Sequence, residues 1–571
     1  MNRGDLNLAC AWALVDELVR AGVRHACLSP GSRSTALVLA LARHPGIELH
    51  IHLDERSSGF IALGIAKALG RPVAVACTSG TAAAELFPAV VEASQAGMPL
   101  LVLTADRPPR LRGTGANQTI DQVELYGRYA RGYFEPPVPV TDEDIEAWGA
   151  AGREAVAAAA SLPIGPAHVN CPVDEPLTPG EVELPQPGAR RQRPPGPKPW
   201  EDLATPDDVE RVAGAISGRR GVIVAGPRSW EDSGDVGVLA DRLGWPLLAE
   251  PLSGLRRLDE GLRAGQPLRA GQALLTAEGW LDARRPEVVL QVGAAPTTRA
   301  TQDLVGSGQK LIVIDIHHLE PDPEGRATIR LHVQPGDVVN ALGHLAPAPF
   351  GWRTEWEVAD EAARIALDDV LDAEAAPNGL RTARDVAAAI PESGILLVGN
   401  SLPVRDLDLS MAPRDGLRVL GNRGASGIDG LISTSVGIAT ARRGPTYALL
   451  GDLSFLHDLG ALAWSARHEP PDITLVVVNN GGGQVFSLLP QRELPEHERL
   501  FVTPHHADLE ALTRASGAAY VRVEAADDLV ATVAEPPAGI RVVEVVVDAD
   551  HDRRVRDDMR AAVGEALARL P

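Results

Sequence analysis

TYALLGDLSFLHDLGALAWSARHEPPDITLVVVNN, at residues 446–480, contains two apolar runs separated by a helical pattern. Runs that are apolar on both faces are typical of strands buried in a parallel sheet. The segment FLHDLGALAWSARH between them is expected to form the crossover helix. Because parallel strands end at one edge of a sheet, Asp452 and Asn479, 27 residues apart, are expected to lie side by side there.

The two residues at these strand ends have side chains suited to binding magnesium. A carboxylate and an amide oxygen are hard ligands that suit Mg²⁺, which usually shares its shell with phosphate oxygens. A helix starting after Ser454 would offer free N–H groups to a diphosphate. The alternative is that Asp452 and Asn479 are ordinary turn residues. Their pairing, with NNGGG following, favours the metal site.

The same alternation of apolar runs and helical patterns recurs along the whole chain. In the first third, the runs are HACLSP (25–30), ELHIHLDE (48–55), VAVACTSG (73–80) and PLLVLTAD (99–106). The fold class is therefore α/β, with three Rossmann-like doubly wound parallel-sheet domains. The expected boundaries are an N-terminal domain at 1–183, a linker at 184–205, a middle domain at 206–345, a linker at 346–378 and a C-terminal domain at 379–571.

Composition limits the classes of function. The 571 residues are 45% hydrophobic and 23% charged, as in a soluble globular protein, which excludes a disordered or fibrous chain. The net charge of −22 argues against general binding of nucleic acid or anionic membranes, so anionic ligands would need a local cluster of positive charge. Four cysteines in 571 residues argue against a disulfide scaffold, and without CxxC spacing they form no sequence-evident zinc site. No apolar run reaches the length of a membrane span, and a cytoplasmic location is expected.

Several common nucleotide and hydrolase motifs are missing from the sequence. No GxGxxG, GxxxxGK[ST] or GxSxG is present, which argues against a dinucleotide enzyme, a P-loop NTPase and a serine hydrolase. His50 and His52 are spaced to lie on one face of a strand. They could form a metal-binding pair, although such pairs are more often packed or exposed histidines.

Other polar candidates follow the apolar runs. Glu55 follows the second run and precedes a helix, where a carboxylate is also favoured by the helix dipole alone. Arginines recur in Gly/Pro/Ser loops just after apolar runs, where guanidinium groups suit bidentate capture of carboxylates or phosphates. Any single one could be a solvated surface arginine, but the repeated position is informative. The set is Arg33, Arg107, Arg299, Arg405 and Arg423.

Longer motifs resemble one known family. They are SPGSRST (29–35), DERSSGFIALGIAK (54–67), TSGTAAAELFPAVVEA (78–93), LTADRPP (103–109), GANQTIDQ (115–122), GNRGASGIDG (421–430), GDLSFLHD (451–458) and NNGGGQVFSLLP (479–490). They resemble the 2-succinyl-5-enolpyruvyl-6-hydroxy-3-cyclohexene-1-carboxylate synthases of menaquinone biosynthesis, which are thiamine diphosphate enzymes. The resemblance covers both outer domains, whereas the middle domain matches only in outline.

The resemblance implies a transferase with the thiamine diphosphate enzyme fold. Its cofactors would be thiamine diphosphate and Mg²⁺ or Mn²⁺, and its substrates would be 2-oxoglutarate and isochorismate. The enzyme would decarboxylate 2-oxoglutarate and add the succinyl carbanion to isochorismate in a 1,4-addition. A homodimer or homotetramer with active sites at the subunit interface is also implied. The cofactor chemistry, rather than the protein, would supply the electron sink.

The resemblance also implies roles for individual residues. Glu55 would activate the cofactor, and Gln118 would approach the reacting centre. The metal would be held by Asp452, Asn479 and the carbonyl of Gly481, and the cofactor contacted by Gly451, Leu453, Ser454, Asn479 and Ile428, the last as an apolar wedge. Substrate contacts would come from Ser32, Arg33, Arg107, Asn117, Gln118, Arg299, Ser401, Arg405 and Arg423. Many family members carry Lys-Arg where this chain has Thr298-Arg299, which weakens that one assignment.

Two rival functions remain open at this point. One is another thiamine diphosphate enzyme, such as an acetohydroxyacid-synthase-like enzyme that acts on pyruvate. The arginine set favours dicarboxylates over pyruvate, and no flavin fingerprint is present. The other is a non-catalytic relative, which would be expected to lose Glu55 or the metal pair; this chain retains both.

Overall fold

The computed structural model describes residues 2–187, 205–227, 233–257, 265–315, 322–334, 338, 341–442, 444–463 and 469–570. Residues 188–204, most of the first expected linker, lie outside these ranges. The contacts divide the chain into two compact units, each described by itself below. The first contains Met1–Pro197, Asn422–Arg443 and Ser454–Ile473, and the second contains Lys198–Gly421, Gly444–Leu453 and Thr474–Pro571.

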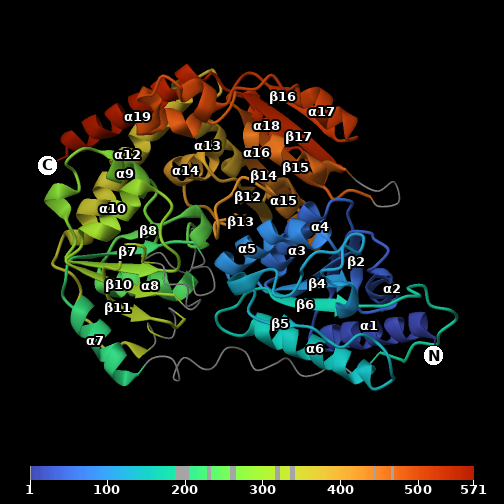
Figure 1. The fold of residues 1–571 in the computed structure, drawn as a ribbon. Helices are drawn as coiled ribbons and strands as arrows, with labels where there is room; N and C mark the ends of the chain where they lie inside the picture. The colour runs from blue at the N-terminus through green and yellow to red at the C-terminus, as the bar shows by residue number, and fades with distance from the viewer. Residues whose placement is uncertain are drawn as a thin grey trace. The chain divides into compact units, whose positions relative to one another are not determined.

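The first unit is built on a six-stranded sheet with the order β2-β1-β3-β4-β6-β5 (Figure 1). Its strands are β1 (His25–Leu28), β2 (Glu48–Ile51), β3 (Val73–Cys77), β4 (Leu100–Asp106), β5 (Tyr133–Phe134) and β6 (Ala167–Pro172). All of these strands pair in parallel. The main helices of this unit are α1 (Arg3–Arg20), α2 (Thr35–Arg43), α3 (Glu55–Leu69), α4 (Thr81–Glu85), α5 (Phe87–Ala96), α6 (Asp144–Ala160) and α15 (Leu431–Ala441).

Helix α3 packs very closely against α15 in this unit. A Cβ atom added at Gly64 would lie 2.1 Å from the carbonyl oxygen of Thr434, and one added at Gly437 would lie 2.1 Å from that of Ile61. Only glycine permits this approach, because any side chain would collide with the facing backbone. The crossing therefore fixes α3, the helix that begins at Glu55, against the loop and helix from residues 422–441.

The second unit contains two further sheets. The five-stranded sheet has the order β11-β10-β9-β7-β8 and the six-stranded sheet the order β13-β12-β14-β15-β17-β16. The first of them consists of β7 (Gly221–Ala225), β8 (Leu247–Ala249), β9 (Val288–Val292), β10 (Lys310–Ile314) and β11 (Ala327–Leu331). The other consists of β12 (Gly394–Val398), β13 (Leu417–Leu420), β14 (Thr446–Gly451), β15 (Ile473–Asn479), β16 (Ala519–Val523) and β17 (Ile540–Val546).

Helices cover both of these sheets. They are α7 (Pro206–Ile216), α8 (Ser233–Leu243), α9 (Gly271–Thr276), α10 (Arg299–Ser307), α12 (Trp352–Ala373), α13 (Gly379–Ala389), α14 (Leu402–Ser410), α17 (Leu509–Ala515), α18 (Asp528–Ala534) and α19 (Ala549–Ala568). The expected linker at 346–378 contains α12, whose Trp352 and Trp356 are buried in the core of the five-stranded sheet. Helix α19 joins the same core through Val555 and Met559.

The structure confirms the α/β fold class with three parallel sheets, and the apolar runs quoted above for the first third correspond to β1–β4. The domain boundaries stay a prediction. Sequence reasoning missed the short strands β5 and β8, the buried strand β6, and the edge strands β11 and β16. In β6, His168 and Asn170 interrupt the apolar pattern because both bind Thr104 of the neighbouring strand β4, at 2.7 and 2.9 Å.

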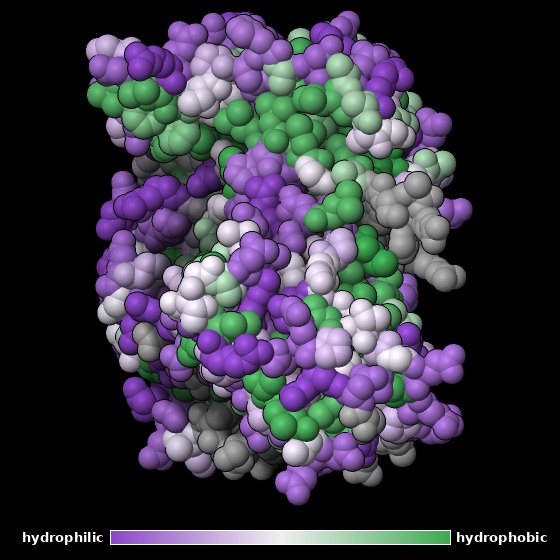
Figure 2. Space-filling model, turned by 45° about the vertical axis from the view of Figure 1, so that its right-hand side comes forward, coloured by the Kyte–Doolittle hydropathy of each residue, from purple (hydrophilic) through white to green (hydrophobic). Residues whose placement is uncertain are grey.

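The surface carries both polar and apolar residues. Figure 2 shows hydrophilic residues over much of the face in view, with hydrophobic residues gathered in several patches between them. Large apolar side chains are exposed after β15, at Leu489, Leu494 and Leu500. No helix of the described residues has both the length and the hydropathy that crossing a membrane requires.

Candidate active site

Asp452 and Asn479 lie at the ends of two adjacent strands. Strand β14 ends at Gly451, strand β15 ends at Asn479, and the two strands are neighbours in the sheet. Helix α16 begins at Asp452 itself, three residues earlier than the sequence predicts, and ends at His457. The expected crossover helix is thus short and is followed by a 3₁₀ turn at Leu459–Leu462. Residues 464–468 of the expected segment lie outside the described ranges.

The Asp452 carboxylate is buried and held by backbone groups. Its Oδ1 accepts from the Leu453 N–H at 2.6 Å, and its Oδ2 accepts from the Gly482 N–H at 2.9 Å. His505 Nε2 lies 3.3 Å from Oδ2. Burial raises the pKa of Asp452, and the two N–H groups and His505 act against that rise. The bond to Gly482 joins the loops that follow β14 and β15.

The orientation of the Asn479 amide is set by Glu544. Asn479 Nδ2 donates to Glu544 Oε1 at 2.5 Å, and Tyr520 donates its hydroxyl proton to the other Glu544 oxygen. The amide oxygen Oδ1 therefore faces the opposite way and accepts from the Gly481 N–H at 3.2 Å. Glu544 is buried, so this amide orientation is fixed from within the sheet.

The NNGGG turn leaves room in front of these oxygens. Gly481 has φ +77° and a Cβ atom there would contact nothing within 4 Å. Gly482 has φ +135°, and its Cβ would lie 2.3 Å from the Val502 carbonyl oxygen, so a side chain is excluded. A buried carboxylate, an amide oxygen turned toward the turn and the nearby Gly481 carbonyl make a hard-oxygen donor set that fits Mg²⁺ or Mn²⁺.

Glu55 is the first residue of α3. Asp54 caps this helix, with its side chain accepting from the Ser57 N–H at 3.2 Å. Burial raises the pKa of the half-buried Glu55, the N–H of its own residue opposes the rise, and Asp54 and Glu85 add to it. A raised pKa favours the protonated form of the carboxyl group, and this suits a residue that must hold and release a proton.

A buried acidic residue supports the start of α3. Asp458 accepts from the Ser433 N–H at 2.7 Å and the Ser433 hydroxyl at 3.0 Å, and Arg56 lies 3.6 Å from it. Burial raises the pKa of Asp458 to about 6, although these partners lower it. Arg56 also donates to the His457 carbonyl at 3.0 Å. The residue after Glu55 is thereby anchored.

Two of the five arginines lie close together in the first unit. Arg107 is buried and donates to the Ser79 hydroxyl and, at 2.8 Å, to the Gln118 carbonyl. Buried Arg33 donates to the Val173 carbonyl at 3.2 Å and to exposed Glu175 at 3.3 Å. Burial lowers the pKa of Arg107, and the charge of Arg33 lowers it further. Binding an anion would relieve this repulsion between guanidinium groups.

The predicted neighbours of this arginine pair are partly exposed. Gln118 has φ +53°, rare for a residue other than glycine, and its Nε2 donates to the Ser79 carbonyl at 3.1 Å. Such backbone strain is often concentrated at functional sites. Asn117 and Ser32 are exposed. The structure thus brings Arg33, Arg107 and Gln118 into one cluster.

Arg423 and Ile428 are carried by one loop of the same unit. The buried carboxylate of Glu92 accepts from the Gly424 N–H at 3.0 Å and from the Ala425 N–H at 2.7 Å. Lys67 Nζ lies 3.3 Å from the same carboxylate. The loop that presents Arg423 is therefore held by two charge-assisted bonds to helix α5.

The other two arginines differ sharply in environment. Arg405 of α14 donates to the carbonyl of Ser401 at 2.6 Å, and Ser401 itself has φ +71°. These two predicted substrate residues thus lie together at the start of one helix. Arg299 begins α10, is 77% exposed, and pairs with Asp303 at 2.9 Å. Within the described part of the second unit, Arg299 thus faces an acid of its own helix rather than Ser401 or Arg405.

Sequence reasoning missed four residues that shape the site. Ser79 binds Arg107, Glu92 holds the Arg423 loop, Glu544 orients Asn479, and His505 faces Asp452. Ser79 carried a signal because it follows an apolar run within VAVACTSG, and Glu92 lies within the quoted motif at 78–93. The others act through contacts with residues far along the chain. Of the remaining predicted cofactor residues, Ser454 is buried and Gly451 ends strand β14.

Comparison with known proteins agrees with this geometry. Residues 9–125 match the thiamine pyrophosphate enzyme N-terminal TPP binding domain, and residues 411–546 match the C-terminal TPP binding domain. A protein of Thermobifida fusca is 42% identical over 98% of this chain and 99% of its own length, and one of Saccharopolyspora erythraea is 40% identical over the same shares. A protein of Haloarcula marismortui is 38% identical over all of both chains. All three are named 2-succinyl-5-enolpyruvyl-6-hydroxy-3-cyclohexene-1-carboxylate synthase.

Proposed function

Because this chain belongs to the family of 2-succinyl-5-enolpyruvyl-6-hydroxy-3-cyclohexene-1-carboxylate synthases, we propose that it takes 2-oxoglutarate and isochorismate as substrates. The reaction releases CO₂ from 2-oxoglutarate and joins the remaining succinyl unit to isochorismate by 1,4-addition. The product lies on the route to menaquinone. The observation that carries the proposal is the cluster of buried Arg33 and Arg107, since both substrates are dicarboxylates.

The cofactor is thiamine diphosphate, as the two matched domains indicate. When bound, it supplies the electron sink for decarboxylation. Asp452, Asn479 and the Gly481 carbonyl would hold its divalent metal, Mg²⁺ or Mn²⁺. Glu544 keeps the Asn479 amide oxygen turned toward this position.

Glu55 would exchange a proton with the cofactor. Its raised pKa, caused first by burial, allows the carboxyl group to share a proton with a weakly basic ring nitrogen. Asp54 and Arg56, on either side of it in the sequence, are each tied by hydrogen bonds, which fixes the start of α3. The side chain thus acts as a positioned general acid–base group.

The arginines would divide between the substrates. Arg405 and Ser401 belong to the diphosphate-binding part of the chain and would bind the carboxylate of the succinyl side. Arg33, Arg107 and Arg423 would bind isochorismate, with Gln118 near the reacting centre. Arg299 is the weakest member of the set, because Asp303 already neutralises it.

The active protein would be a homodimer or homotetramer in the cytoplasm. The exposed Leu489, Leu494 and Leu500 follow the NNGGG turn, and a subunit contact would remove these apolar side chains from water. Light scattering coupled to size-exclusion chromatography measures the mass directly. A monomer that retains full activity would contradict the oligomer.

The central experiment mixes purified protein with thiamine diphosphate, Mg²⁺, 2-oxoglutarate and isochorismate. We expect CO₂ release and loss of isochorismate in equal amounts. Two parallel reactions serve as controls, one without isochorismate and one with pyruvate in place of 2-oxoglutarate. Efficient turnover of pyruvate would favour the acetohydroxyacid-synthase-like alternative, and no turnover at all would favour the non-catalytic one.

A further inference from the structure

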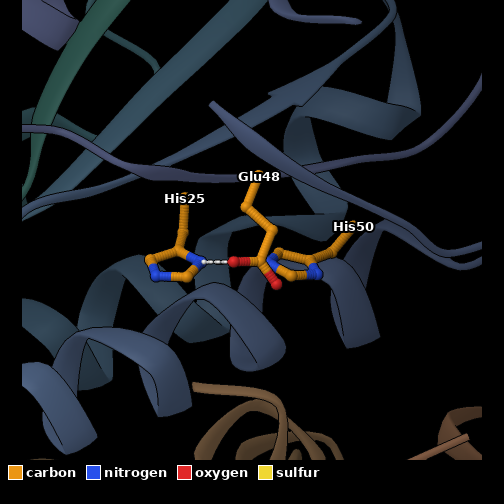
Figure 3. Close-up of side chains that lie close together, drawn as sticks. All are labelled: His25, Glu48 and His50. Carbon is orange, nitrogen blue, oxygen red and sulfur yellow. Dashed lines mark hydrogen bonds and ion pairs between the residues drawn. The ribbon is translucent and has the colours of Figure 1, made fainter. Parts of the chain in front are cut away.

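His25, Glu48 and His50 form a cluster that the proposed function does not use. His25 and Glu48 begin the neighbouring strands β1 and β2 and are register partners, and Cys27 is the partner of His50. Because side chains alternate along a strand, Glu48 and His50 lie on the same face of β2. Figure 3 shows the imidazole of His25 on that face too, with the Glu48 carboxylate drawn close to both rings.

The donor atoms are spaced as metal ligands are. His25 Nδ1 lies 3.2 Å from His50 Nε2 and 3.7 Å from a Glu48 carboxylate oxygen. One ligand atom from each residue falls within 4.8 Å of the others. Bonds of ~2.0–2.1 Å in a tetrahedral arrangement place neighbouring donor atoms roughly 3.3 Å apart. A metal ion could therefore enter with only small movements of the side chains.

The electrostatics of the cluster also suit a cation. The two rings lie nearly parallel, with 17° between their planes, and His25 Nδ1 and His50 Nε2 are within hydrogen-bond distance, so a metal ion would replace the proton that they share. A neutral imidazole has the lone pair that a metal needs. Glu48 is 64% exposed, which gives an ion access from solvent.

We propose that His25 Nδ1, His50 Nε2 and the Glu48 carboxylate bind a late first-row divalent metal ion, with Zn²⁺ the best match. Two imidazoles and one carboxylate are typical zinc ligands and leave one position for water. This site differs from the hard-oxygen set around Asp452, which suits Mg²⁺ or Mn²⁺. The proposal does not depend on the proposed reaction.

A metal ion bound at this site would stabilise the edge of the first sheet. Strand β2 is only four residues long, lies at the edge, and is followed within a few residues by Glu55. A bridge between the amino ends of β1 and β2 would hold the edge strand in register. The expected result of binding is a more stable first unit, since a ligand that binds only the folded state stabilises it.

The test uses the full chain saturated with thiamine diphosphate and Mg²⁺ and stripped of other metals. Zn²⁺ is titrated by calorimetry, and Co²⁺ is added as a spectroscopic probe of tetrahedral coordination. We expect one Zn²⁺ per chain and a higher midpoint of thermal unfolding. Removing a residue that only hydrogen-bonds to a metal ligand typically lowers metal affinity ~10–100-fold. His50→Gln and Glu48→Gln each change a ligand itself, so each should weaken Zn²⁺ binding by at least that much.

His344→Gln is the matched control, because His344 is an exposed histidine outside the cluster. Glu48→Gln keeps the test decisive if a histidine variant does not fold, since Glu48 is largely exposed. Zinc affinity that is unchanged in both Glu48→Gln and His50→Gln would overturn the proposal. So would binding that survives in these variants but is lost in Asp452→Ala, because the zinc would then occupy the magnesium site.

Discussion

Glu92 is expected to stabilise both the fold and the loop that carries Arg423. Its carboxylate, 3% exposed, receives three contacts: Lys67 at 3.3 Å, the Gly424 N–H at 3.0 Å and the Ala425 N–H at 2.7 Å. A Cβ atom at Gly424 would lie 2.6 Å from the backbone nitrogen of Ala96, so the loop lies directly against α5. The carboxylate thus ties the loop both to α5 and to α3.

Substituting Glu92→Ala removes all three contacts at once. Breaking a buried ion pair by deleting one partner costs roughly 3–5 kcal/mol, and little screening is expected here because Lys67 and Glu92 are 8% and 4% exposed. Glu92→Gln keeps one acceptor oxygen and should cost less. Lys67→Met leaves the two backbone bonds to Glu92 intact, so it should also cost less than Glu92→Ala.

Urea unfolding of each variant measures these differences, with Glu154→Ala as the control at an exposed glutamate of α6. Steady-state kinetics below the unfolding transition then tests the loop. If Arg423 binds isochorismate, the KM for isochorismate should rise in Glu92→Ala while that for 2-oxoglutarate changes little. A Glu92→Ala variant as stable as the Glu154→Ala control, with both KM values unchanged, would refute the reasoning.

Three further predictions concern the proposed active site. Asp452→Ala should abolish metal-dependent binding of thiamine diphosphate, and calorimetry in Mg²⁺ that gives an unchanged affinity would contradict the ligand assignment. Glu55→Gln should still bind cofactor but exchange its C2 proton ~10²–10⁴-fold more slowly, as followed by NMR; exchange at the normal rate would leave Glu55 a helix-start carboxylate. Arg405→Ala should raise the KM for 2-oxoglutarate and Arg107→Ala that for isochorismate, whereas equal effects on both substrates would refute this sorting.

Much of the sheet architecture could be predicted because buried parallel strands leave a clear apolar pattern. Strands β14 and β15 are such runs, and their order in the chain was enough to predict neighbouring ends at Asp452 and Asn479. The start of α16 was placed three residues too late. Asp452 binds the N–H groups of Leu453 and Gly482, so the helix begins directly at the strand end rather than after a turn.

The partners of the site residues could not be predicted in the same way. Glu544 lies 65 residues after Asn479, and Glu92 lies 332 residues before Gly424. Glu92 lies inside the quoted motif at 78–93, but nothing near either acid in the sequence indicates which distant residue it contacts. The same holds for His25, which follows no apolar run and joins Glu48 and His50 only through the pairing of β1 with β2. The expected pair of His50 and His52 is not what the structure brings together, since β2 ends at Ile51 and His52 instead contacts Asp54.

The partners of the arginines explain how a chain of net charge −22 can offer positive charge to dicarboxylates. Structural arginines are neutralised by buried acids, as Arg556 is by Asp406 and Asp552. Arg107 and Arg405 instead donate to carbonyl or hydroxyl oxygens, which orient a guanidinium without cancelling its charge. Because the charge is retained and partly desolvated, a substrate carboxylate binds more strongly there than at an arginine that is already paired with an acid. By the same reasoning an arginine that already faces an acid has less to offer a substrate, which holds for Arg299 beside Asp303 and for Arg33 beside the exposed Glu175. A substrate carboxylate at Arg33 would have to replace Glu175, so Arg107 is expected to contribute more to binding than Arg33.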